Sequence, residues 1–441
     1  MKNKDEEVKH DETNTSGLMP KLRFPEFLNH SPWEEKRLEE IFEFHTTANN
    51  SRADLSETGD TFYIHYGDIH TKFHTYIDFS KDVVPRITSG LYKNATFLKN
   101  GDLIVADASE DTVGIAKAVE VRGLGHGVKA IAGLHTILLR DYEKKYVNGF
   151  KGFLREIETV KKQIQRLAVG VKVYAVSKTV LKQVLLPLPS PPEQQKIADC
   201  LSSVDELIAA HAQKLDTVKA YKKGLMQQLF PAEGEPVPKL RFPDFRGAPE
   251  WEEKRLGKVA EIVTGNTPST SNSDYYGGNR LFVSPADIAD GRYITSTKTT
   301  ITEAGFKETR PVKVNSILFV CIGSTIGKIS QNRVECATNQ QINSVIPFSG
   351  YSSDFMYSAL ECNARQIAST AGKHAVPIIN KTDFSNTIIS VPSFDEQQKV
   401  AECLTTLDEL ITSQSQKLDI LKAHKKGLLQ QLFPFADEVD G

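Results

Sequence analysis

Residues 193–231, EQQKIADCLSSVDELIAAHAQKLDTVKAYKKGLMQQLFP, and residues 396–434, EQQKVAECLTTLDELITSQSQKLDILKAHKKGLLQQLFP, are two copies of one segment. The copies are offset by 203 residues and are identical at 26 of 39 positions. Neither copy contains a proline before its last residue, and both are rich in residues that favour helices. Pro191 and Pro192 precede the first copy. The sequence therefore predicts two long helices, each about 57 Å in length at 1.5 Å per residue.

The apolar residues of both copies alternate between spacings of four and three, which is typical of a coiled-coil seam. An isolated helix is only marginally stable in water, so each stripe needs a partner, and the other copy is the obvious one. Polar His211 and Gln414 occupy equivalent places in the middle of the seam, where such residues fix the register. The predicted seam positions are Ile197, Leu201, Val204, Ile208, His211, Leu215, Val400, Leu404, Leu407, Ile411, Gln414 and Leu418.

Gly224 and Gly427 occupy equivalent positions near the ends of the two predicted helices. A glycine inside a helix costs about 1 kcal/mol relative to alanine. Close approach between the two helices is the expected reason for keeping glycine at both positions.

A second repeat precedes each half of the chain. KLRFPEF at 21–27 recurs as KLRFPDF at 239–245, and WEEKRL at 33–38 recurs unchanged at 251–256. The sequences between these markers differ, which favours one shared frame that carries two different inserts. The expected organisation is an acidic tail 1–17, a first domain 18–190, a first helix 191–231, a second domain 232–392, a second helix 393–434 and a tail 435–441.

Both inserts have the composition of mixed α/β domains. Short apolar runs that predict strands cover 102–106 and 137–139 in the first insert and 316–320 and 342–346 in the second. Residues 155–167 predict a short helix with a basic face. Loops rich in Gly, Ser, Asn and Thr separate these elements.

Several classes of protein are excluded by composition and motif. No apolar run approaches the ~18 residues of a membrane span, and the polar N-terminus is unlike a signal peptide, so we expect a cytoplasmic protein. Five cysteines without a C-x-x-C pair argue against a disulfide framework or a zinc ribbon, and we expect no metal site. Gly323–Lys328 is similar to a phosphate loop, but its glycines are one residue too close and Ile329 replaces the metal-binding hydroxyl. We expect no catalytic residue and no cofactor in this chain.

The loops of the inserts are rich in side chains that grip phosphates and read base edges. Asn339, Gln340 and Gln341 are of special interest, because Asn and Gln can pair with adenine through two hydrogen bonds. The candidate DNA-binding residues are Asp68, His70, Lys117, His135, Lys172, Asn266, Thr267, Ser269, Asp287, Ser324, Lys328, Asn339, Gln340, Gln341 and Lys373.

The chain resembles the specificity subunit of type I restriction-modification enzymes. The resemblance rests on Pro192–Ala198 and Lys223–Phe230, each repeated in the second half, and on the two upstream motifs. Gly67–Ile69 and Asp287–Ile288 are similar to the early loop of the family's recognition domains. Ile326–Lys328 and Asn339–Gln341 are similar to a later one. In the first insert, Ala132–Thr136 replaces the Asn-Gln-Gln run, which leaves open whether both loops read DNA alike.

The resemblance implies two α/β target-recognition domains held apart by two antiparallel helices. It also implies that this chain reads a bipartite double-stranded DNA site with an unread spacer. Two methyltransferase subunits would bind S-adenosylmethionine and methylate adenine. Motor-nuclease subunits would use ATP and Mg to translocate and cut DNA. Two alternatives are considered. A stand-alone enzyme would require a cofactor loop or a nuclease cluster, and the sequence shows neither. A coiled-coil scaffold or adaptor without DNA contact would be distinguished by DNA binding of the chain with its methyltransferase partner.

Overall fold

The structure is a computed structural model, and the residues that it describes are 18–170, 173–288, 291–372 and 376–434. They form two compact units. Unit 1 contains the residues up to Ile208 and those from Ile420 onward, and unit 2 contains Ala209–Asp419. The predictions that lie outside the described residues are those for the tails 1–17 and 435–441, for Lys172 and for Lys373.

Unit 1 is built on a mixed five-stranded sheet. In spatial order its strands are β2 (Glu43–His45), β10 (Thr136–Arg140), β6 (Leu103–Ala106), β8 (Ala118–Arg122) and β4 (Tyr76–Asp78). The smaller pairings are the sheet β5 (Arg86–Ile87), β3 (Thr61–Ile64) and β9 (Ala130–Ala132), the pair β1 (Glu34–Arg37) and β12 (Leu185–Leu188), and the pair β7 (Ala108–Ser109) and β11 (Tyr174–Ala175). The α-helices are α1 (Leu38–Ile41), α2 (Tyr66–Thr71), α3 (Glu158–Leu167) and α4 (Lys178–Lys182). The 3-10 helices are Pro25–Phe27, Arg52–Asp54 and Lys151–Glu156.

Unit 2 repeats this topology. Its central sheet has the order β14 (Ala260–Thr264), β21 (Ile342–Pro347), β18 (Ile317–Val320), β19 (Ile329–Asn332) and β16 (Tyr293–Ile294). The smaller pairings are the sheet β17 (Thr299–Ile301), β15 (Tyr276–Val283) and β20 (Ala337–Thr338), and the pair β13 (Glu252–Arg255) and β22 (Ile388–Val391). The helices are α6 (Leu256–Val259), α7 (Glu303–Lys307), α8 (Ser353–Ser369), α9 (Lys381–Ser385), and the 3-10 turns Pro243–Phe245 and Ser273–Tyr275. The predicted mixed α/β class is confirmed.

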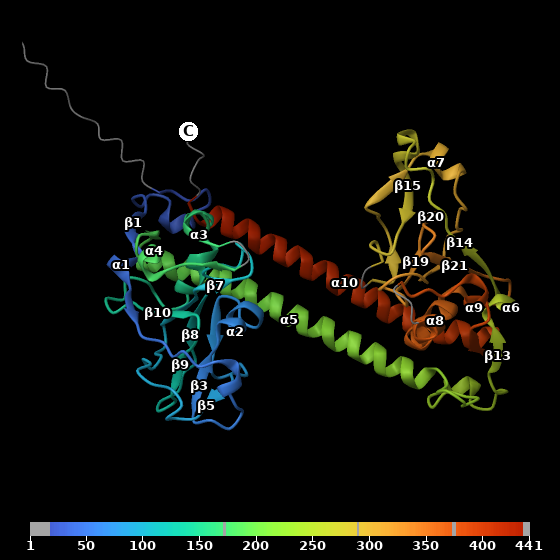
Figure 1. Ribbon diagram of the computed structural model, residues 1–441, viewed down its shortest axis with the longest axis horizontal. Coiled ribbons are helices and arrows are strands. Elements are labelled where there is room, and N and C mark those ends of the chain that lie inside the picture. The colour runs from blue at the N-terminus through green and yellow to red at the C-terminus, as the bar shows by residue number, and fades with distance from the viewer. Residues whose placement is uncertain (1–17, 171–172, 289–290, 373–375, 435–441) are drawn as a thin grey trace, which may run out of the picture. The chain divides into compact units, whose positions relative to one another are not determined.

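The central strands are buried on both faces, which explains their continuous apolar sequences. On β6, Leu103 and Val105 pack toward α3 and the frame of the unit, whereas Ile104 and Ala106 pack toward the small sheet. On β18 of unit 2, Phe319 and Leu318 lie in two separate cores in the same way. In each unit the small sheet lies on the side of the central sheet away from α3 or α8 (Figure 1). The predicted helix 155–167 is α3, which begins at Glu158 after a 3-10 turn.

The two repeated segments are the helices α5 (Pro191–Leu229) and α10 (Phe394–Leu432). Every predicted seam position is buried or half-buried. In unit 1 the start of α5 packs beside the end of α10, with Ile197 and Leu201 in one core with Leu432. In unit 2 the end of α5 packs beside the start of α10, so that Leu229 shares a core with Leu404. The helices therefore pair in the antiparallel sense.

Polar contacts between the two helices support this orientation. In unit 1, Lys425 Nζ lies 2.6 Å from the Asp205 carboxylate, and in unit 2, Lys222 Nζ lies 2.6 Å from Asp408. The two pairs are related by the 203-residue offset, since Lys222 is equivalent to Lys425 and Asp205 to Asp408. A parallel pair would place like charges opposite each other. In the seam of unit 2, His211 Nδ1 lies 3.0 Å from Gln414 Oε1.

The explanation expected for the two helix glycines is wrong. A Cβ atom added at Gly224 or Gly427 would meet no heavy atom of the described chain within 4 Å, so neither glycine permits a close helix–helix contact. Among the described residues, no helix combines the length and apolar character needed to cross a membrane.

Candidate nucleic-acid interface

Three of the candidate residues of unit 1 come together at one end of its central sheet. His70 at the end of α2, Lys117 before β8, and His135 before β10 all line a cavity of about 780 Å³. Tyr66 also lines it, and its ring is edge-to-face to both imidazoles, at centroid distances of 6.2 Å from His70 and 5.3 Å from His135. Residues from five separate segments thus form one polar and aromatic concavity, of the kind that accepts a ligand.

The imidazoles of the cavity are held by specific partners. His135 Nδ1 lies 3.1 Å from the Asp107 carboxylate, while its side chain stays half exposed. His70 Nε2 lies 2.8 Å from the carbonyl oxygen of Ala108. His135 has a left-handed backbone with φ of 56°, so the chain turns sharply there and projects the ring from the sheet edge. A fixed imidazole of this kind can offer one ring nitrogen to a base edge.

Asp68 is wrongly assigned to DNA contact by the sequence. Gly67–Ile69 lies inside α2 and not in a loop, and Asp68 is 1% exposed. Its carboxylate pairs with Lys72 at 3.1 Å and with Arg52 at 3.2 Å. A buried carboxylate that is already paired with two cationic side chains is not available to phosphates or bases.

Lys117 is half-buried at the wall of the same cavity. Its Nζ donates a hydrogen bond to the carbonyl oxygen of His70 at 3.1 Å. Burial lowers the pKa of Lys117, and the nearby Glu156 carboxylate opposes that change. The turn that precedes Lys117 is supported by buried Arg155, which donates to the carbonyl oxygens of Ile115 and Val113 at 2.8 Å each.

In unit 2 the candidate residues form an amide network. Thr267 Oγ donates to Gln340 Oε1 at 2.8 Å, and both side chains are exposed. Asn339 Nδ2 donates to Gln341 Oε1 at 3.0 Å, and Gln341 Nε2 donates to the carbonyl oxygen of Ile322 at 3.4 Å. Gln340 therefore presents an exposed amide whose orientation is fixed by Thr267, whereas Asn339 and Gln341 mostly satisfy each other.

The remaining candidates of unit 2 surround this network. Asn266 Nδ2 donates to the carbonyl oxygen of Glu308 at 2.8 Å, and Ser269 Oγ lies 2.8 Å from Ser271 Oγ. Ser324 and Lys328 are exposed, and Lys328 Nζ donates to the carbonyl oxygen of Ile288 at 3.2 Å.

Asp287 is the second candidate that the structure corrects. One carboxylate oxygen accepts from the main-chain N–H and the hydroxyl of Ser284, at 2.8 and 2.6 Å. The other accepts from the main-chain N–H of Lys298 at 2.8 Å. These bonds close the turn before Ile288, so Asp287 has a structural role.

The same main-chain hydrogen bonds recur in both units and align their loops. Lys117 corresponds to Lys328, because the carbonyl oxygen of each accepts a hydrogen bond from the last residue of β6 or of β18. His135 corresponds to Gln341, because the carbonyl oxygen of each accepts from the residue that follows β6 or β18. Within the predicted replacement Ala132–Thr136, residues Gly133–His135 occupy the backbone positions of Asn339–Gln341. The bonds are Ala106 N to Lys117 O (2.9 Å) and Val320 N to Lys328 O (2.9 Å), Asp107 N to His135 O (3.1 Å) and Cys321 N to Gln341 O (2.8 Å), and Gly133 N to Ile64 O (2.9 Å) and Asn339 N to Val283 O (3.0 Å).

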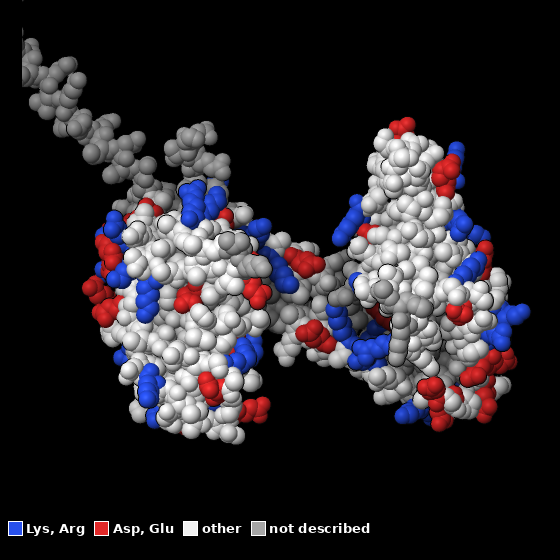
Figure 2. Space-filling view, viewed as in Figure 1, with Lys and Arg blue, Asp and Glu red and all other residues white. Residues whose placement is uncertain are grey.

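Charge is mixed around these sites. The visible face of each unit carries Lys and Arg interspersed with Asp and Glu (Figure 2). On this face, attraction of a polyanion therefore depends on local groups and not on a surface of one sign.

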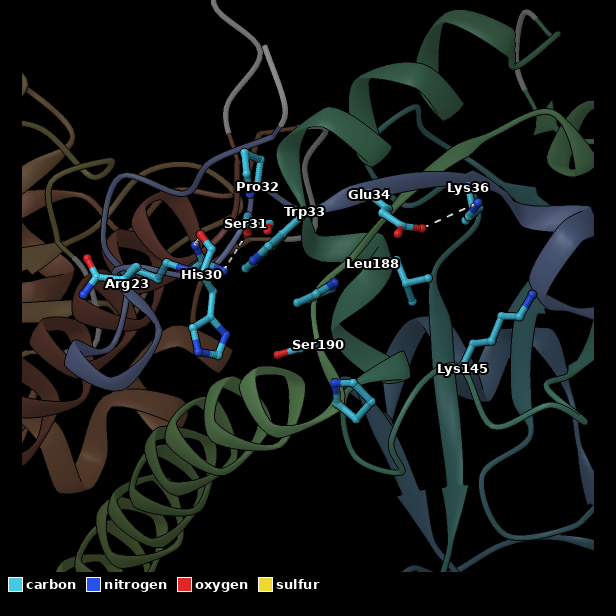
Figure 3. Close-up of a pocket in the computed structure, with 13 residues that line it drawn as sticks. Arg23, His30, Ser31, Pro32, Trp33, Glu34, Lys36, Lys145, Leu188 and Ser190 are labelled. Atoms are coloured by element: carbon cyan, nitrogen blue, oxygen red, sulfur yellow. Dashed lines mark hydrogen bonds and ion pairs between the residues drawn. The ribbon is translucent and has the colours of Figure 1, made fainter. Parts of the chain in front are cut away.

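Residues of the repeated motifs meet in a cluster that the sequence did not predict. In unit 1, the Arg23 guanidinium donates to Glu193 at 2.7 and 2.8 Å, and Trp33 Nε1 donates to the same carboxylate at 3.1 Å. Arg23, Trp33 and their neighbours line a cavity of about 750 Å³ (Figure 3). Unit 2 has the equivalent cluster of Arg241, Trp251 and Glu396. The recurrence of the three motifs, with Arg, Trp and Glu unchanged, was the sequence signal for this cluster, whereas no sequence signal pointed to Tyr66, Asp107 or Arg155.

Comparison with known proteins places the chain in a family. A family model described as type I restriction modification DNA specificity domain matches residues 30–220 and 249–423. The specificity subunit of the type I restriction enzyme MjaIX of Methanocaldococcus jannaschii is 26% identical over 198 residues, 43% of this chain and 46% of the relative. The HindI specificity subunit of Haemophilus influenzae is 33% identical over 150 residues, 32% of each chain. Each match spans less than half the length of the relative.

Solved structures share the fold. The S subunit of a type I restriction-modification system from M. genitalium aligns with a TM-score of 0.62 at 15% identity, over 95% of this chain and 100% of that one. A chain from a study of assembly and conformational transition of the type I system aligns with a TM-score of 0.51 at 18% identity, over 91% and 97%. Because the family model matches both halves, the chain belongs to the family of type I restriction-modification DNA specificity domains.

Proposed function

We propose that this chain is the DNA-specificity subunit of a type I restriction-modification system. It reads a bipartite double-stranded DNA site, with one half-site per unit. Membership of the specificity-domain family supports the proposal. The observation that carries it is that two domains of one topology present different side chains, Gly133–His135 and Asn339–Gln341, from the same backbone position.

The chemistry of the two loops suits different base edges. The Gln340 amide can both donate and accept, which matches adenine in the major groove. His135 offers an imidazole nitrogen, and the neighbouring Leu134 offers an apolar surface that suits a thymine methyl group. Two readers of unlike chemistry give an asymmetric target.

The chain contributes recognition and no catalysis in this proposal. Two methyltransferase subunits supply S-adenosylmethionine and adenine methylation, and motor-nuclease subunits supply ATP-driven translocation and cleavage with Mg. The protein works in the cytoplasm, where its DNA lies.

Methylome sequencing of cells with and without the gene tests the proposal. We expect one bipartite adenine-methylated motif to vanish when the gene is deleted and to return on complementation. An unchanged methylome in a strain that expresses the methyltransferase subunits would favour the scaffold without DNA readout. Methylation by the purified chain alone would contradict the non-catalytic role.

A further inference from the structure

Lys117 and Lys328 are placed alike in two domains whose other loop residues differ. The sequence Gly-Ile-Ala-Lys ends at Lys117, and Thr-Ile-Gly-Lys ends at Lys328. Both lysines follow a turn whose last residue has a left-handed backbone, with φ of 54° at Ala116 and 93° at Gly327. The unit 1 turn keeps this conformation even though alanine is strained there.

Each of the two lysine side chains also donates to a main-chain carbonyl oxygen. Lys117 Nζ donates to the His70 carbonyl oxygen at 3.1 Å, and Lys328 Nζ donates to the Ile288 carbonyl oxygen at 3.2 Å. These carbonyls belong to equivalent segments that follow β3 and β15. The bond holds each ammonium at the edge of the polar surface and occupies one of its three protons.

Neither ammonium is neutralised by a carboxylate. Within the described chain, no Asp or Glu oxygen lies within 4.0 Å of either nitrogen. Each lysine thus has no ion-pair partner within 4.0 Å in the described chain and keeps two N–H groups for an external anion, although burial lowers the pKa of Lys117 and Glu156 lines the same cavity. Lys117 lines the cavity that also holds His135, and Lys328 is exposed in the equivalent place beside the Gln341 loop.

A DNA contact that both units make in the same way cannot distinguish the sequences of the two half-sites. The sugar-phosphate backbone is the part of DNA that is common to both half-sites, and its contacts position a protein without specifying bases. Residues that differ at one backbone position, such as His135 and Gln341, are suited to base discrimination. Residues that are retained with the same geometry are suited to the backbone.

We propose that Lys117 and Lys328 are equivalent binding sites, one per unit, for a phosphate oxygen of the DNA backbone. The proposal rests on the proposed function and names which residues anchor each unit to its half-site. The carbonyl bond orients the lysine before DNA arrives, so little side-chain freedom is lost on binding.

The test measures affinity against salt for the complex of this chain with its methyltransferase subunits. The probes are a labelled duplex that carries the motif found by methylome sequencing and a duplex of scrambled sequence. The variants are Lys117→Ala, Lys328→Ala and the charge-preserving Lys117→Arg and Lys328→Arg. Lys182→Ala on α4 and Lys258→Ala on α6 are matched controls outside the candidate loops.

We expect each candidate alanine variant to bind both duplexes roughly tenfold more weakly at 50 mM salt, with the ratio between duplexes unchanged. Loss of one phosphate contact lowers the salt slope by ~0.9, so the deficit shrinks about 3.5-fold between 50 and 200 mM salt. The arginine variants should keep the slope, and the two controls should match the unmodified chain.

The result differs if Lys117 only stabilises the fold through its hydrogen bond to the His70 carbonyl oxygen. Lys117→Ala would then lower the melting temperature or alter base preference while the salt slope stayed unchanged, and that outcome would overturn the phosphate assignment. If the unmodified complex instead failed to prefer its motif at any salt concentration, the proposed function itself would be wrong.

Discussion

The two units share their sheets and their arginine–tryptophan–glutamate cluster, and they differ in the loop side chains at one end of the central sheet. Both have a five-stranded sheet of the same order, a small sheet of the same pairing, and a frame in which a buried glutamate receives an arginine and a tryptophan. Unit 1 presents the imidazoles of His70 and His135 around Tyr66. Unit 2 presents a network of amides. Packing thus constrains the sheet and frame, whereas exposed loop side chains are free to change without loss of fold.

The largest expected effect concerns the arginine–tryptophan–glutamate cluster of each unit. Glu193→Ala and Glu396→Ala each leave a buried or nearly buried arginine without its carboxylate, which costs about 3–5 kcal/mol of unfolding free energy. Urea unfolding of the two variants should give similar losses, because the clusters are equivalent. A large loss in one variant and none in the other would show that the frames are not equivalent. Glu193→Gln keeps the shape and tests how much of the loss is charge.

The next effect concerns the equivalent loops that hold Gly133–His135 in unit 1 and Asn339–Gln341 in unit 2. Replacing Leu134 and His135 by the Gln-Gln of unit 2 should change one half of the methylated motif and leave the other half intact. Gly133 is kept, because a Cβ atom there would lie 2.1 Å from the buried Tyr63 ring. A good two-bond contact contributes about 1–3 kcal/mol of discrimination, so the original motif should be methylated roughly 5- to 150-fold less efficiently. Methylome sequencing of the variant strain provides the measurement. A change in both half-sites would show that the units do not read independently.

A smaller difference is expected in the pH dependence of the two units. Buried Glu120 on β8 occupies the place of buried, neutral Gln331 on β19. Burial raises the pKa of Glu120 above its ordinary 4.5, against the opposing effects of Lys151 and of the main-chain N–H groups of Gly149 and Gly152.

A carboxyl group whose pKa is raised by folding stabilises the folded state at low pH, and this contribution is lost as pH rises through the folded-state pKa. The unfolding free energy of Glu120→Gln minus that of the unmodified chain should therefore increase as pH rises from about 4 to 7. Parallel urea titrations at several pH values measure this difference, and a flat difference for Glu120→Gln would contradict the assignment.

The smallest expected effect lies in the shared turn. Ala116→Gly should relieve left-handed strain and leave stability unchanged or raise it by up to about 1 kcal/mol, because glycine adopts positive φ freely. Gly327→Ala should destabilise unit 2 by about 1–2 kcal/mol, since its Cβ would lie 3.2 Å from the Ala364 carbonyl oxygen. Thermal denaturation of both variants tests whether the turns are equivalent, and a loss of stability in Ala116→Gly would show that they are not.

Sequence alone determined the two long helices, their seam, the division into repeated frames and divergent inserts, and the α/β class. These features depend on local periodicity and repetition, which are visible along the chain. It also identified Lys117, His135, Lys328 and Gln340 as polar loop residues, although it could not separate them from Asp68 and Asp287. A carboxylate on a short polar segment has the same sequence signature whether it contacts solvent or closes a turn.

Only the tertiary structure decided which distant groups meet. The partner of Glu193 lies 170 residues away at Arg23, and His135 binds Asp107 across 28 residues. No periodicity encodes these contacts, because they form where strands and loops of unrelated sequence are brought together by the sheet. The common topology of the two inserts was also not visible in the sequence. Many different apolar residues can fill a buried position, so the two sequences diverge while the backbone hydrogen bonds keep the same strand register.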